Sequence, residues 1–399
     1  MQKACAANSL IREGKALVYV PDLDRAIAPH GLEPAWLEVF YNPRMVFNRD
    51  LSVAAIAAYA RLLAPLPEFI IVEPLTATGV RGVRYALEVE GPHRVVMGDI
   101  DKCAVEITTR NINLNKLTGK ARVYWLDARE LLLATRSLLE KPPLVVDIDP
   151  FGSPAPYLDA ALSVIGNHGL LAVTATDLAV LEGSKRRAAR RRYGVDLVKA
   201  PESKEIGLRI LLGYIARIAA SHDKYIEPVL SYYTDHYFRV YVVVRRGARK
   251  ADKMLENSIG HAYYCREDKR TYISDEPPSC ISYSKPERIG PLWVSAMNNA
   301  SFIREVVSEL KAREYLATAG RGLSLLRLLE CESSLEDRTL HVSIDQIASF
   351  ARSNMPPMDK LLDLLRSEGY VACRSHYSPI AIRTNAPYTS LVKLLLASV

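Results

Sequence analysis

Apolar residues along the first two thirds of the chain follow two alternating spacings. Short continuous apolar runs bounded by proline, glycine or charged residues are typical of strands buried on both faces. Segments with an apolar residue at every third or fourth position lie between these runs and are typical of helices. The predicted strands cover 68–75, 94–100, 121–126, 143–150 and 169–176, and the predicted helices cover 80–90, 104–115, 130–140 and 157–165. This alternation predicts an α/β fold with a parallel, doubly wound sheet.

The segment after these elements predicts a change of strand direction. A long amphipathic helix is expected at 202–222, followed by two β-rich runs at 227–233 and 237–246. Because only 234–236 separates the two runs, we expect a hairpin that adds an antiparallel final strand to the mostly parallel sheet. This combination favours a class I (Rossmann-like) methyltransferase fold, since dinucleotide-binding sheets are usually fully parallel.

The ends of the chain carry weaker patterns. We expect a strand at 14–20, an irregular connector at 21–38, and a helix at 52–63 that ends before two prolines. A polar linker is predicted at 247–258, and short strands and turns at 250–300.

Helical spacing returns in the last hundred residues. Helices are predicted at 301–317, 321–332, 344–353 and 357–370, followed by an extended stretch at 371–388. Two helices followed by a strand pair resemble a winged-helix arrangement. We therefore predict two domains, with an N-terminal extension and methyltransferase domain at 1–248 and a smaller α+β domain at 249–399.

Composition narrows the class of protein. The 399 residues include 52 Lys and Arg against 45 Asp and Glu, a net charge of +7 that weakly favours a polyanionic partner. No signal core or membrane-length apolar run is present, so we expect a cytoplasmic protein. The six cysteines are far apart and form no CxxC pair, which predicts reduced, mostly buried thiols and no metal site. Cys265 and Cys280 could still lie close together in the folded protein.

The run PLVVDIDPFGSP at 143–154 carries the most informative candidate chemistry. A buried strand there ends in a turn that contains Asp149, Pro150 and Phe151. Ligands of open α/β sheets bind beyond the carboxyl ends of the strands. An aromatic ring can stack on a flat base while an acid accepts its N–H groups, as base-modifying enzymes require. The alternative is an ordinary Asp-Pro turn with a phenylalanine that belongs to the core.

A turn at 76–82 follows the first strand of the sheet and predicts a cofactor site. It lacks the GxGxxG spacing for a pyrophosphate, but Gly79 and Gly82 allow a smaller ligand to approach the backbone at a helix start. S-adenosylmethionine fits this site because it has a carboxylate and no phosphates. Arg81 is placed to add a charge-assisted contact to that carboxylate.

Acids follow the next two strands. Asp99 is expected to accept the ribose hydroxyls, and Asp127 the adenine amino group, with Ala128 beside the adenine ring. Each acid alone is also explained as a helix cap or a solvated turn, and Asp127 before 128–132 is a good N-cap candidate. Taken together, the glycine turn and the acids at the ends of the next two strands favour a nucleoside cofactor.

A basic segment at 184–195 predicts contact with a polyanion. It contains Lys185, Arg186, Arg187, Arg190, Arg191 and Arg192, with no acid between Glu182 and Asp196. Such a segment repels itself, and phosphates would relieve that repulsion. Because the segment follows the strand at 169–176, we expect it at the same sheet edge as Asp149. The alternative is a flexible, solvated loop.

Five motifs together resemble one family. VFYNPRMVFNRD (39–50), LTATGVRGVRYALE (75–88), DIDPFGSP (147–154), TATDLAVL (174–181) and YYTDHYFR (232–239) resemble archaeal-type Trm1, the tRNA guanine-26 N2-dimethyltransferases. The similarity extends over almost the whole chain. It implies a class I methyltransferase domain with a family-specific C-terminal domain that contacts tRNA, S-adenosylmethionine as the cofactor, and tRNA as the partner.

The resemblance also implies a role for individual residues. Asp149 matches the catalytic acid, Phe151 the ring that stacks on guanine, and Phe40 a second ring that closes over the base, while the Pro150 carbonyl is expected to accept the other N–H. Arg49 and Arg81 match cofactor-binding arginines, and Asp99, Asp127 and Ala128 match the ribose and adenine contacts. Where relatives commonly carry two cysteines, this chain has Glu182 and Ala189, which removes any disulfide there.

Two other functions stay open from the residues. An acid-Pro-aromatic turn also serves DNA amino-methyltransferases that act on adenine N6 or cytosine N4, and a non-catalytic RNA-binding protein can retain the same fold. No obligate protein partner is indicated, and the oligomeric state is left open. A nicotinamide oxidoreductase is least favoured, since the first turn lacks phosphate-binding spacing.

Overall fold

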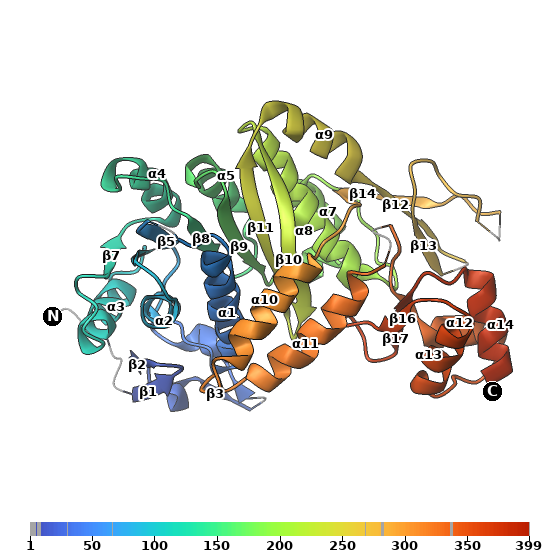
Figure 1. The fold of residues 1–399 in the computed structure, drawn as a ribbon, viewed down its shortest axis with the longest axis horizontal. Coiled ribbons are helices and arrows are strands. Elements are labelled where there is room, and N and C mark those ends of the chain that lie inside the picture. Colours follow the sequence, from blue (N-terminus) through green and yellow to red (C-terminus); the bar gives the residue numbers. More distant parts are fainter. Residues whose placement is uncertain are drawn as a thin grey trace.

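The computed structural model describes residues 5, 9–29, 31–65, 67–267, 269–280, 283–335 and 338–398 (Figure 1). Its centre is a seven-stranded sheet in the order β10-β11-β9-β8-β5-β6-β7. The strands are β5 (Phe69–Glu73), β6 (His93–Asp99), β7 (Ala121–Trp125), β8 (Val145–Ile148), β9 (Gly169–Ala175), β10 (Lys224–Thr234) and β11 (Tyr237–Arg246).

The predicted hairpin and reversed strand are confirmed. Strand β11 runs antiparallel to both β9 and β10, whereas the other neighbouring pairs are parallel. The sheet is therefore mostly parallel with one reversed strand, as expected for a class I methyltransferase. Strands β5 and β8 are neighbours although β6 and β7 separate them in the chain. The crossovers leave this pair toward opposite sides, which makes it the topological switch point of the sheet.

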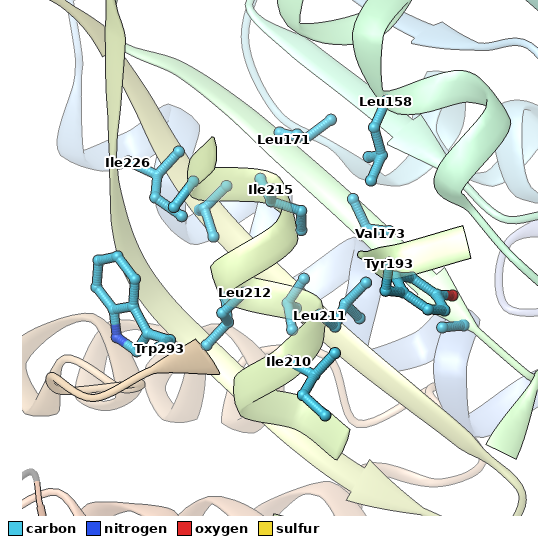
Figure 2. Packing of buried hydrophobic residues seen from close by; sticks show 14 of the residues in the cluster. Leu158, Leu171, Val173, Tyr193, Ile210, Leu211, Leu212, Ile215, Ile226 and Trp293 are labelled. Carbon is cyan, nitrogen blue, oxygen red and sulfur yellow. The ribbon is translucent and has the colours of Figure 1, made fainter. Parts of the chain in front are cut away.

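Helices cover both faces of the sheet. One face packs against α4 (Ala128–Leu138), α5 (Ala155–Val164) and α8 (Ser203–Ala220); the other packs against α1 (Val46–Leu62), α2 (Val80–Glu88), α10 (Ala300–Lys311) and α11 (Ala319–Glu332). The alternation along β5 decides which residue faces which layer. Ile70 and Val72 belong to the α8 cluster, and Ile71 belongs to the α1 cluster. Figure 2 shows Leu211, Leu212 and Ile215 of α8 in the first of these layers.

Shorter elements border the sheet. Strands β1 (Ser9–Glu13) and β2 (Ala16–Val20) form a hairpin, as do the short strands β3 (Ile27–Ala28) and β4 (Gly31–Leu32). Helix α3 (Lys102–Leu114) packs on β7 and β2. After β9 the chain forms α6 (Leu178–Leu181) and α7 (Arg186–Tyr193), so the basic segment is helical.

Helix α1 begins earlier than predicted, at Val46 rather than at residue 52. The Asn42 side chain accepts a hydrogen bond from the Arg44 amide and starts a 3-10 turn that leads into the helix. Its first turns bury Asn48, Arg49 and Asp50. Polar residues at buried positions break the apolar spacing, so the sequence pattern placed the start too late.

The polar linker predicted at 247–258 is wrong, because Ala248–Ser258 forms helix α9. Most positions there are polar or charged. Ala251 and Met254 are nevertheless buried and Leu255 packs beside them, which gives a narrow apolar stripe at helical spacing. Three apolar residues suffice because the helix lies on the edge of an existing core.

The chain beyond α9 contains antiparallel sheets and helices. Strands β12 (Ile259–Cys265), β13 (Arg270–Ile273) and β14 (Glu287–Trp293) form one sheet. The C-terminal lobe, drawn in red in Figure 1, contains β15 (Val342–Ser343), α12 (Ile344–Ala351), α13 (Met358–Ser367), β16 (Ala372–Arg374), β17 (Ala381–Thr384) and α14 (Tyr388–Ser398). The expected order of two helices followed by an antiparallel strand pair is confirmed. Trp293 packs in one of the two layers that cover the main sheet, and Val306 packs in the other. Residues beyond 248 therefore contribute to the core of the sheet, and the domain division at 248 stays a prediction.

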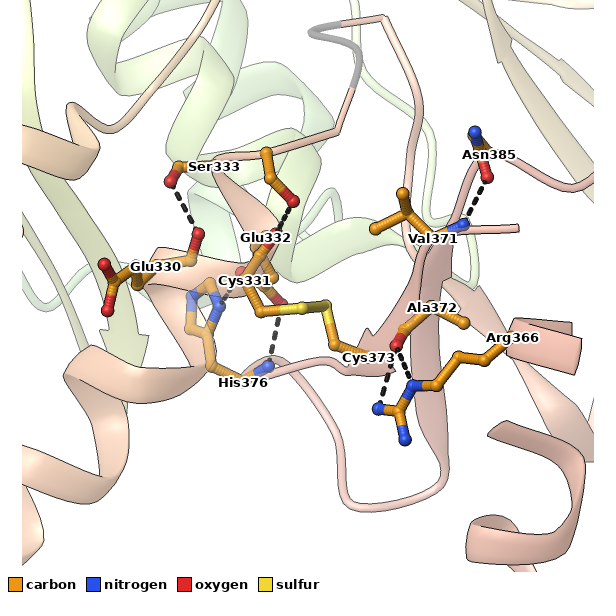
Figure 3. Close-up of a disulfide and its surroundings, with 11 residues drawn as sticks. Glu330, Cys331, Glu332, Ser333, Arg366, Val371, Ala372, Cys373, His376 and Asn385 are labelled. Carbon is orange, nitrogen blue, oxygen red and sulfur yellow. Dashed lines mark hydrogen bonds and ion pairs between the residues drawn. A yellow bond between two sulfur atoms is a disulfide. The ribbon is translucent and has the colours of Figure 1, made fainter. Parts of the chain in front are cut away.

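The expectation of reduced thiols is wrong, because all six cysteines are paired. The disulfides join Cys5 to Cys103, Cys265 to Cys280, and Cys331 to Cys373, across 98, 15 and 42 residues of chain. Figure 3 shows the third disulfide between α11 and β16. Spacing along the chain does not reveal such pairs when tertiary packing brings the residues together. Within the described residues, no helix has the length and hydropathy to cross a membrane, and no group of three or more acidic, His or Cys side chains is placed to hold a metal.

Candidate active site

A cavity of about 400 Å³ opens at the carboxyl ends of β5, β6 and β8. This is the switch point of the sheet, where ligands of such folds bind. Seven of the predicted site residues line it, namely Phe40, Arg49, Arg81, Asp99, Asp149, Pro150 and Phe151. Gly79 lies between two lining residues, Thr78 and Val80. Asp127 and Ala128 are absent from the lining among the described residues.

Asp147 and Asp149 share a buried partner. Successive side chains of a strand point to opposite faces, so Asp147 and Asp149 both lie on the α1 and α2 side of β8. Arg81 of α2 is buried between them: its Nη1 lies 3.3 Å from Asp147 Oδ2, and its Nη2 donates to Asp149 Oδ2. The ion pair with Arg81 therefore fixes the position of the Asp149 carboxylate at the cavity wall.

Asp147 and Arg239 form a layer beneath the cavity that the sequence analysis missed. Arg239 of β11 makes two hydrogen bonds to the Asp147 carboxylate, at 2.7 and 2.9 Å, and Tyr85 donates a third at 2.5 Å. Burial raises the pKa of Asp147, but Arg239 and Arg81 outweigh it and hold this pKa below its usual value. The ionised Asp147 carboxylate thus holds the Arg81 guanidinium in place from below the cavity. A charged residue inside an apolar strand, as in VVDI and YFRV, is the sequence signal for such a pair.

Arg49 is also paired within the protein. Its Nε and Nη2 donate to the Glu13 carboxylate at 2.6 and 2.7 Å, and Nη2 also donates to the Asn42 carbonyl at 3.1 Å. Arg84 approaches the same carboxylate at 2.9 Å. Burial raises the pKa of Glu13, but the two arginines outweigh burial and bring it to about 2. Both predicted cofactor arginines therefore use their N–H groups largely on protein acceptors.

The start of α2 presents polar groups to the cavity. Gly79 caps the helix with a φ of 74°, a left-handed conformation that glycine adopts without strain. Thr78 lines the cavity and is only 1% exposed, and its hydroxyl has no hydrogen-bond partner among the residues that the structure describes. The free amides of a helix start attract a carboxylate. A buried hydroxyl without a partner beside them fits a ligand that supplies an acceptor.

Asp99 is placed as predicted at the end of β6. Its Oδ2 accepts a hydrogen bond from the Ala77 amide at 2.9 Å and its Oδ1 one from the Asp101 amide at 2.9 Å. Burial raises the pKa of Asp99. Asp127 instead caps α4, where its Oδ1 accepts from the Arg129 amide at 2.9 Å. The end of β7 still lies beside Asp99, since the Leu126 amide donates to the Asp99 carbonyl at 3.1 Å.

Two aromatic rings stand at the mouth of the cavity. Phe151 is 69% exposed, and its ring meets that of Phe40 edge to face with centroids 4.2 Å apart. Both rings also border an adjoining cavity of about 280 Å³. Rings in contact leave no room for a base between them, so a base can stack there only after the rings separate.

Comparison with known proteins shows the family to which the chain belongs. The family model for the N2,N2-dimethylguanosine tRNA methyltransferases matches residues 14–396. The chain belongs to this family. It is 41% identical to the tRNA (guanine(26)-N(2))-dimethyltransferase of Aeropyrum pernix over 97% of this chain and 96% of that protein, and 36% identical to that of Metallosphaera sedula over 97% and 96%. The solved complex of Trm1 from Pyrococcus horikoshii with S-adenosyl-L-methionine covers 97% of this chain and 100% of its own, with a TM-score of 0.83 and 32% identity.

Membership of the N2,N2-dimethylguanosine tRNA methyltransferase family confirms the resemblance inferred from the five motifs, and with it the fold. The match runs through the C-terminal lobe as well as the sheet.

In this family member the basic segment forms α7, which follows β9 and so lies at the cavity's edge of the sheet. Its six cations are all exposed. Two of them have acidic partners: Arg190 lies 2.5 Å from Asp196, and Arg192 lies 3.2 Å from Asp177. For Lys185, Arg186, Arg187 and Arg191, the described part of the chain supplies no ion pair. Lys185 at the helix N-cap and these three arginines on α7 remain available to phosphates.

Proposed function

We propose that the cavity at the β5–β8 switch point is the active site of this protein, an S-adenosylmethionine-dependent tRNA (guanine(26)-N2)-dimethyltransferase. The reaction places one and then a second methyl group on the exocyclic N2 of guanine 26. The observation that supports this site most directly is the Asp149 carboxylate, held by Arg81 in a cavity that also contains a helix start and Asp99. Family membership over the whole chain favours tRNA over duplex DNA, and an enzyme over a non-catalytic RNA-binding protein.

The cavity offers a protein group for each part of the cofactor. The α2 amides and the Thr78 hydroxyl would bind the carboxylate, Asp99 would accept the ribose hydroxyls, and Ile100 would contact the adenine ring, with Asp127 and Ala128 toward its edge. S-adenosylmethionine, when bound, supplies an electrophilic methyl group. Arg81 and Arg49 serve the site chiefly by fixing acidic side chains, since those chains already occupy most of their donors.

Asp149 then activates the guanine amine. Arg81 binds Asp149 Oδ2, which leaves Oδ1 to accept one N2–H group. As the nitrogen–methyl bond forms and the bond between that methyl group and the cofactor sulfur breaks, Oδ1 takes the N–H proton and the demethylated cofactor leaves as a thioether. In the first transfer the Pro150 carbonyl accepts the second N–H; in the second transfer only the N–H that faces Asp149 remains. Because the amine lone pair is delocalised into the guanine ring, the amine is a poor nucleophile until its N–H groups are polarised. Most of the acceleration comes from holding the reactants in line, which contributes roughly 7–11 kcal/mol.

The aromatic pair binds the flipped guanine. Phe151 stacks on one face of the base, and Phe40 covers the other after the two rings part. The adjoining cavity bordered by both rings gives them space to move. Edge-to-face contact between the rings thus closes the site until a base enters.

Helix α7 binds the tRNA backbone beside this mouth. Lys185, Arg186, Arg187 and Arg191 contact phosphates directly, while Arg190 and Arg192 first have to leave their acidic partners. The protein acts in the cytoplasm, where its tRNA substrate is found.

The activity is tested with unmodified tRNA and isotope-labelled S-adenosylmethionine, followed by mass spectrometry of the nucleosides. We expect labelled N2-methylguanosine that converts to N2,N2-dimethylguanosine. Transcripts with adenosine at position 26 and duplex DNA are the controls and should stay unlabelled. Labelled duplex DNA, or unchanged labelling of the adenosine-26 transcript, would contradict the proposed function.

Asp149→Ala tests the site within the same assay. We expect methylation to fall by about 10²–10⁴-fold, the usual contribution of a positioned acid or base, while calorimetry still detects cofactor binding. Asp159→Ala is the matched control, because Asp159 is exposed on α5 and pairs with His222. Wild-type turnover by Asp149→Ala would remove Asp149 from the mechanism.

A further inference from the structure

The turn that carries Asp149 and Phe151 is fastened at its far end. The Gly152 amide donates to Thr176 Oγ1 at 2.8 Å, and the Thr176 amide donates back to the Gly152 carbonyl at 3.0 Å. Ser153 Oγ lies 2.8 Å from the hydroxyl of Tyr193. The turn is therefore tied both to the end of β9 and to the last residue of the basic helix α7.

The Tyr193 hydroxyl has a fixed hydrogen-bonding direction. It donates to the Asp177 carboxylate, with oxygens at 2.9 and 3.1 Å. A phenol has one proton and a carboxylate has none to give, so Ser153 must donate to Tyr193. The chain of donors runs from Ser153 through Tyr193 to Asp177, and Asp177 also holds Arg192 at 3.2 Å.

Tyr193 is also firmly packed. Its ring has no exposed surface and lies in the core layer that contains Val173 and Leu211 (Figure 2). Its carbonyl accepts a hydrogen bond from Arg217 of α8 at 2.5 Å. The carboxyl end of α7 is thus anchored in the core at Tyr193, while the cations Arg186 and Arg187 at its other end are exposed.

We propose that Tyr193 is a positioning residue that transmits the seating of tRNA on α7 to the turn bearing Asp149 and Phe151. This inference rests on the proposed function. A phosphate held by Arg186 or Arg187 pulls on a helix of only eight residues. Because the Tyr193 hydroxyl joins the other end of that helix to Ser153, the orientation of the helix sets that of the turn. The Phe151 ring then reaches its working position, parted from Phe40, only when tRNA is seated, while Arg81 keeps the Asp149 carboxylate in place.

Tyr193→Phe tests the hydroxyl alone, since the ring stays in the core. We expect the dissociation constants for tRNA and for S-adenosylmethionine to stay within about twofold of wild type, while the single-turnover rate at saturating substrates falls by about tenfold. Tyr214→Phe is the matched control, because its ring packs edge to face on that of Tyr193 at 5.2 Å and it belongs to the same helix layer. A Tyr193→Phe protein with the wild-type saturated rate, even with a lowered melting temperature, would overturn the proposal.

A double-mutant cycle then tests whether tRNA seating on α7 is coupled to the turn through Tyr193. In a wild-type background, Arg186→Gln with Arg187→Gln should weaken tRNA binding and also slow the saturated rate. In the Tyr193→Phe background the same pair should weaken binding but leave the saturated rate unchanged, because the link is already broken. If the two losses in rate simply multiply, α7 and the turn are not coupled through Tyr193. Failure of wild type to methylate tRNA would instead refute the proposed function, so the two failures are distinguishable.

Discussion

At the residue scale, this site is built from buried arginines whose charge is used within the protein. Arg81 lies between Asp147 and Asp149, and Arg239 holds Asp147 from the other side. Two carboxylates this close would repel each other without the intervening guanidinium. Replacing one member of such a buried network leaves an uncompensated charge, which is strongly destabilising. The network therefore places the Asp149 carboxylate with little freedom to reorient.

Glu13 forms a second buried cluster with Arg49 and Arg84, and this cluster has a measurable pH dependence. The pKa of Glu13 falls from 4.5 in a free chain to about 2 in the folded protein. A lowered carboxyl pKa stabilises the fold fully above pH 4.5, and this contribution is lost as the pH falls toward 2. At 1.36 kcal/mol per unit, the folded state should lose about 2 kcal/mol from this group between pH 7 and pH 3.

Urea unfolding of Glu13→Gln at these two pH values checks the prediction. We expect the variant to be about 3–5 kcal/mol less stable at pH 7, since Arg49 and Arg84 lose a buried partner. Its disadvantage should shrink by about 2 kcal/mol at pH 3. Glu106→Gln, an exposed acid on α3, is the control and should change neither value. An equal disadvantage at both pH values would show that Glu13 is not held in its charged form.

Gly79 is the residue at which backbone geometry limits substitution. A Cβ added there would lie 2.6 Å from Thr108 Cγ2, and its φ of 74° is unfavourable for other residues. Gly79→Ala should therefore destabilise the protein by at least about 2 kcal/mol and weaken S-adenosylmethionine binding, because the start of α2 must shift. Gly119→Ala is the control, since nothing lies within 4 Å of the added atom. Equal unfolding midpoints and cofactor affinities for the two variants would contradict the prediction.

At the element scale, the sequence predicted what depends on local spacing. The five parallel strands and the β10–β11 hairpin follow from apolar runs and turn residues, and Asp99 and Asp149 follow from their places at strand ends. Helix α9 was missed because it borrows its apolar environment from a neighbouring core. The Asp147–Arg239 pair was missed because the two residues are distant in the chain and meet only when β8 and β11 enter one sheet.

The prediction at this scale concerns the cations of helix α7 and their effect on tRNA binding. Replacing Lys185, Arg186, Arg187 and Arg191 with glutamine should weaken tRNA binding and lower the slope of log affinity against log salt concentration by about 0.7–0.9 for each lost phosphate contact. The measurement is tRNA affinity at several salt concentrations. Replacing Arg246, Arg249, Lys250 and Lys253, exposed cations at the opposite edge of the sheet, is the matched control for net charge. An equal loss in both variants would assign the effect to overall charge rather than to α7.

At the scale of the whole molecule, a few long-range contacts join the C-terminal lobe to the sheet. The buried Glu205 carboxylate of α8 pairs with Arg383 at 2.6 Å and with His341 at 2.8 Å. Glu332 of α11 pairs with His376 at 2.6 Å, directly beside the Cys331–Cys373 disulfide (Figure 3). Helices α8 and α11 pack on opposite faces of the sheet, so the lobe is attached to both layers.

The Cys331–Cys373 disulfide contributes to that attachment and yields the last prediction. It closes 42 residues of chain, and loop-closure entropy assigns such a crosslink between about 3 and about 4.7 kcal/mol. Under denaturing, non-reducing conditions, wild type should contain no free thiol by mass spectrometry. Cys331→Ser with Cys373→Ser should lower the unfolding midpoint and expose the lobe to proteolysis between residues 333 and 375. Cys265→Ser with Cys280→Ser, which opens a separate 15-residue loop, should leave the protease sensitivity of the lobe unchanged. Free thiols in wild type, or equal protease sensitivity of the two variants, would show that this disulfide does not help to hold the lobe.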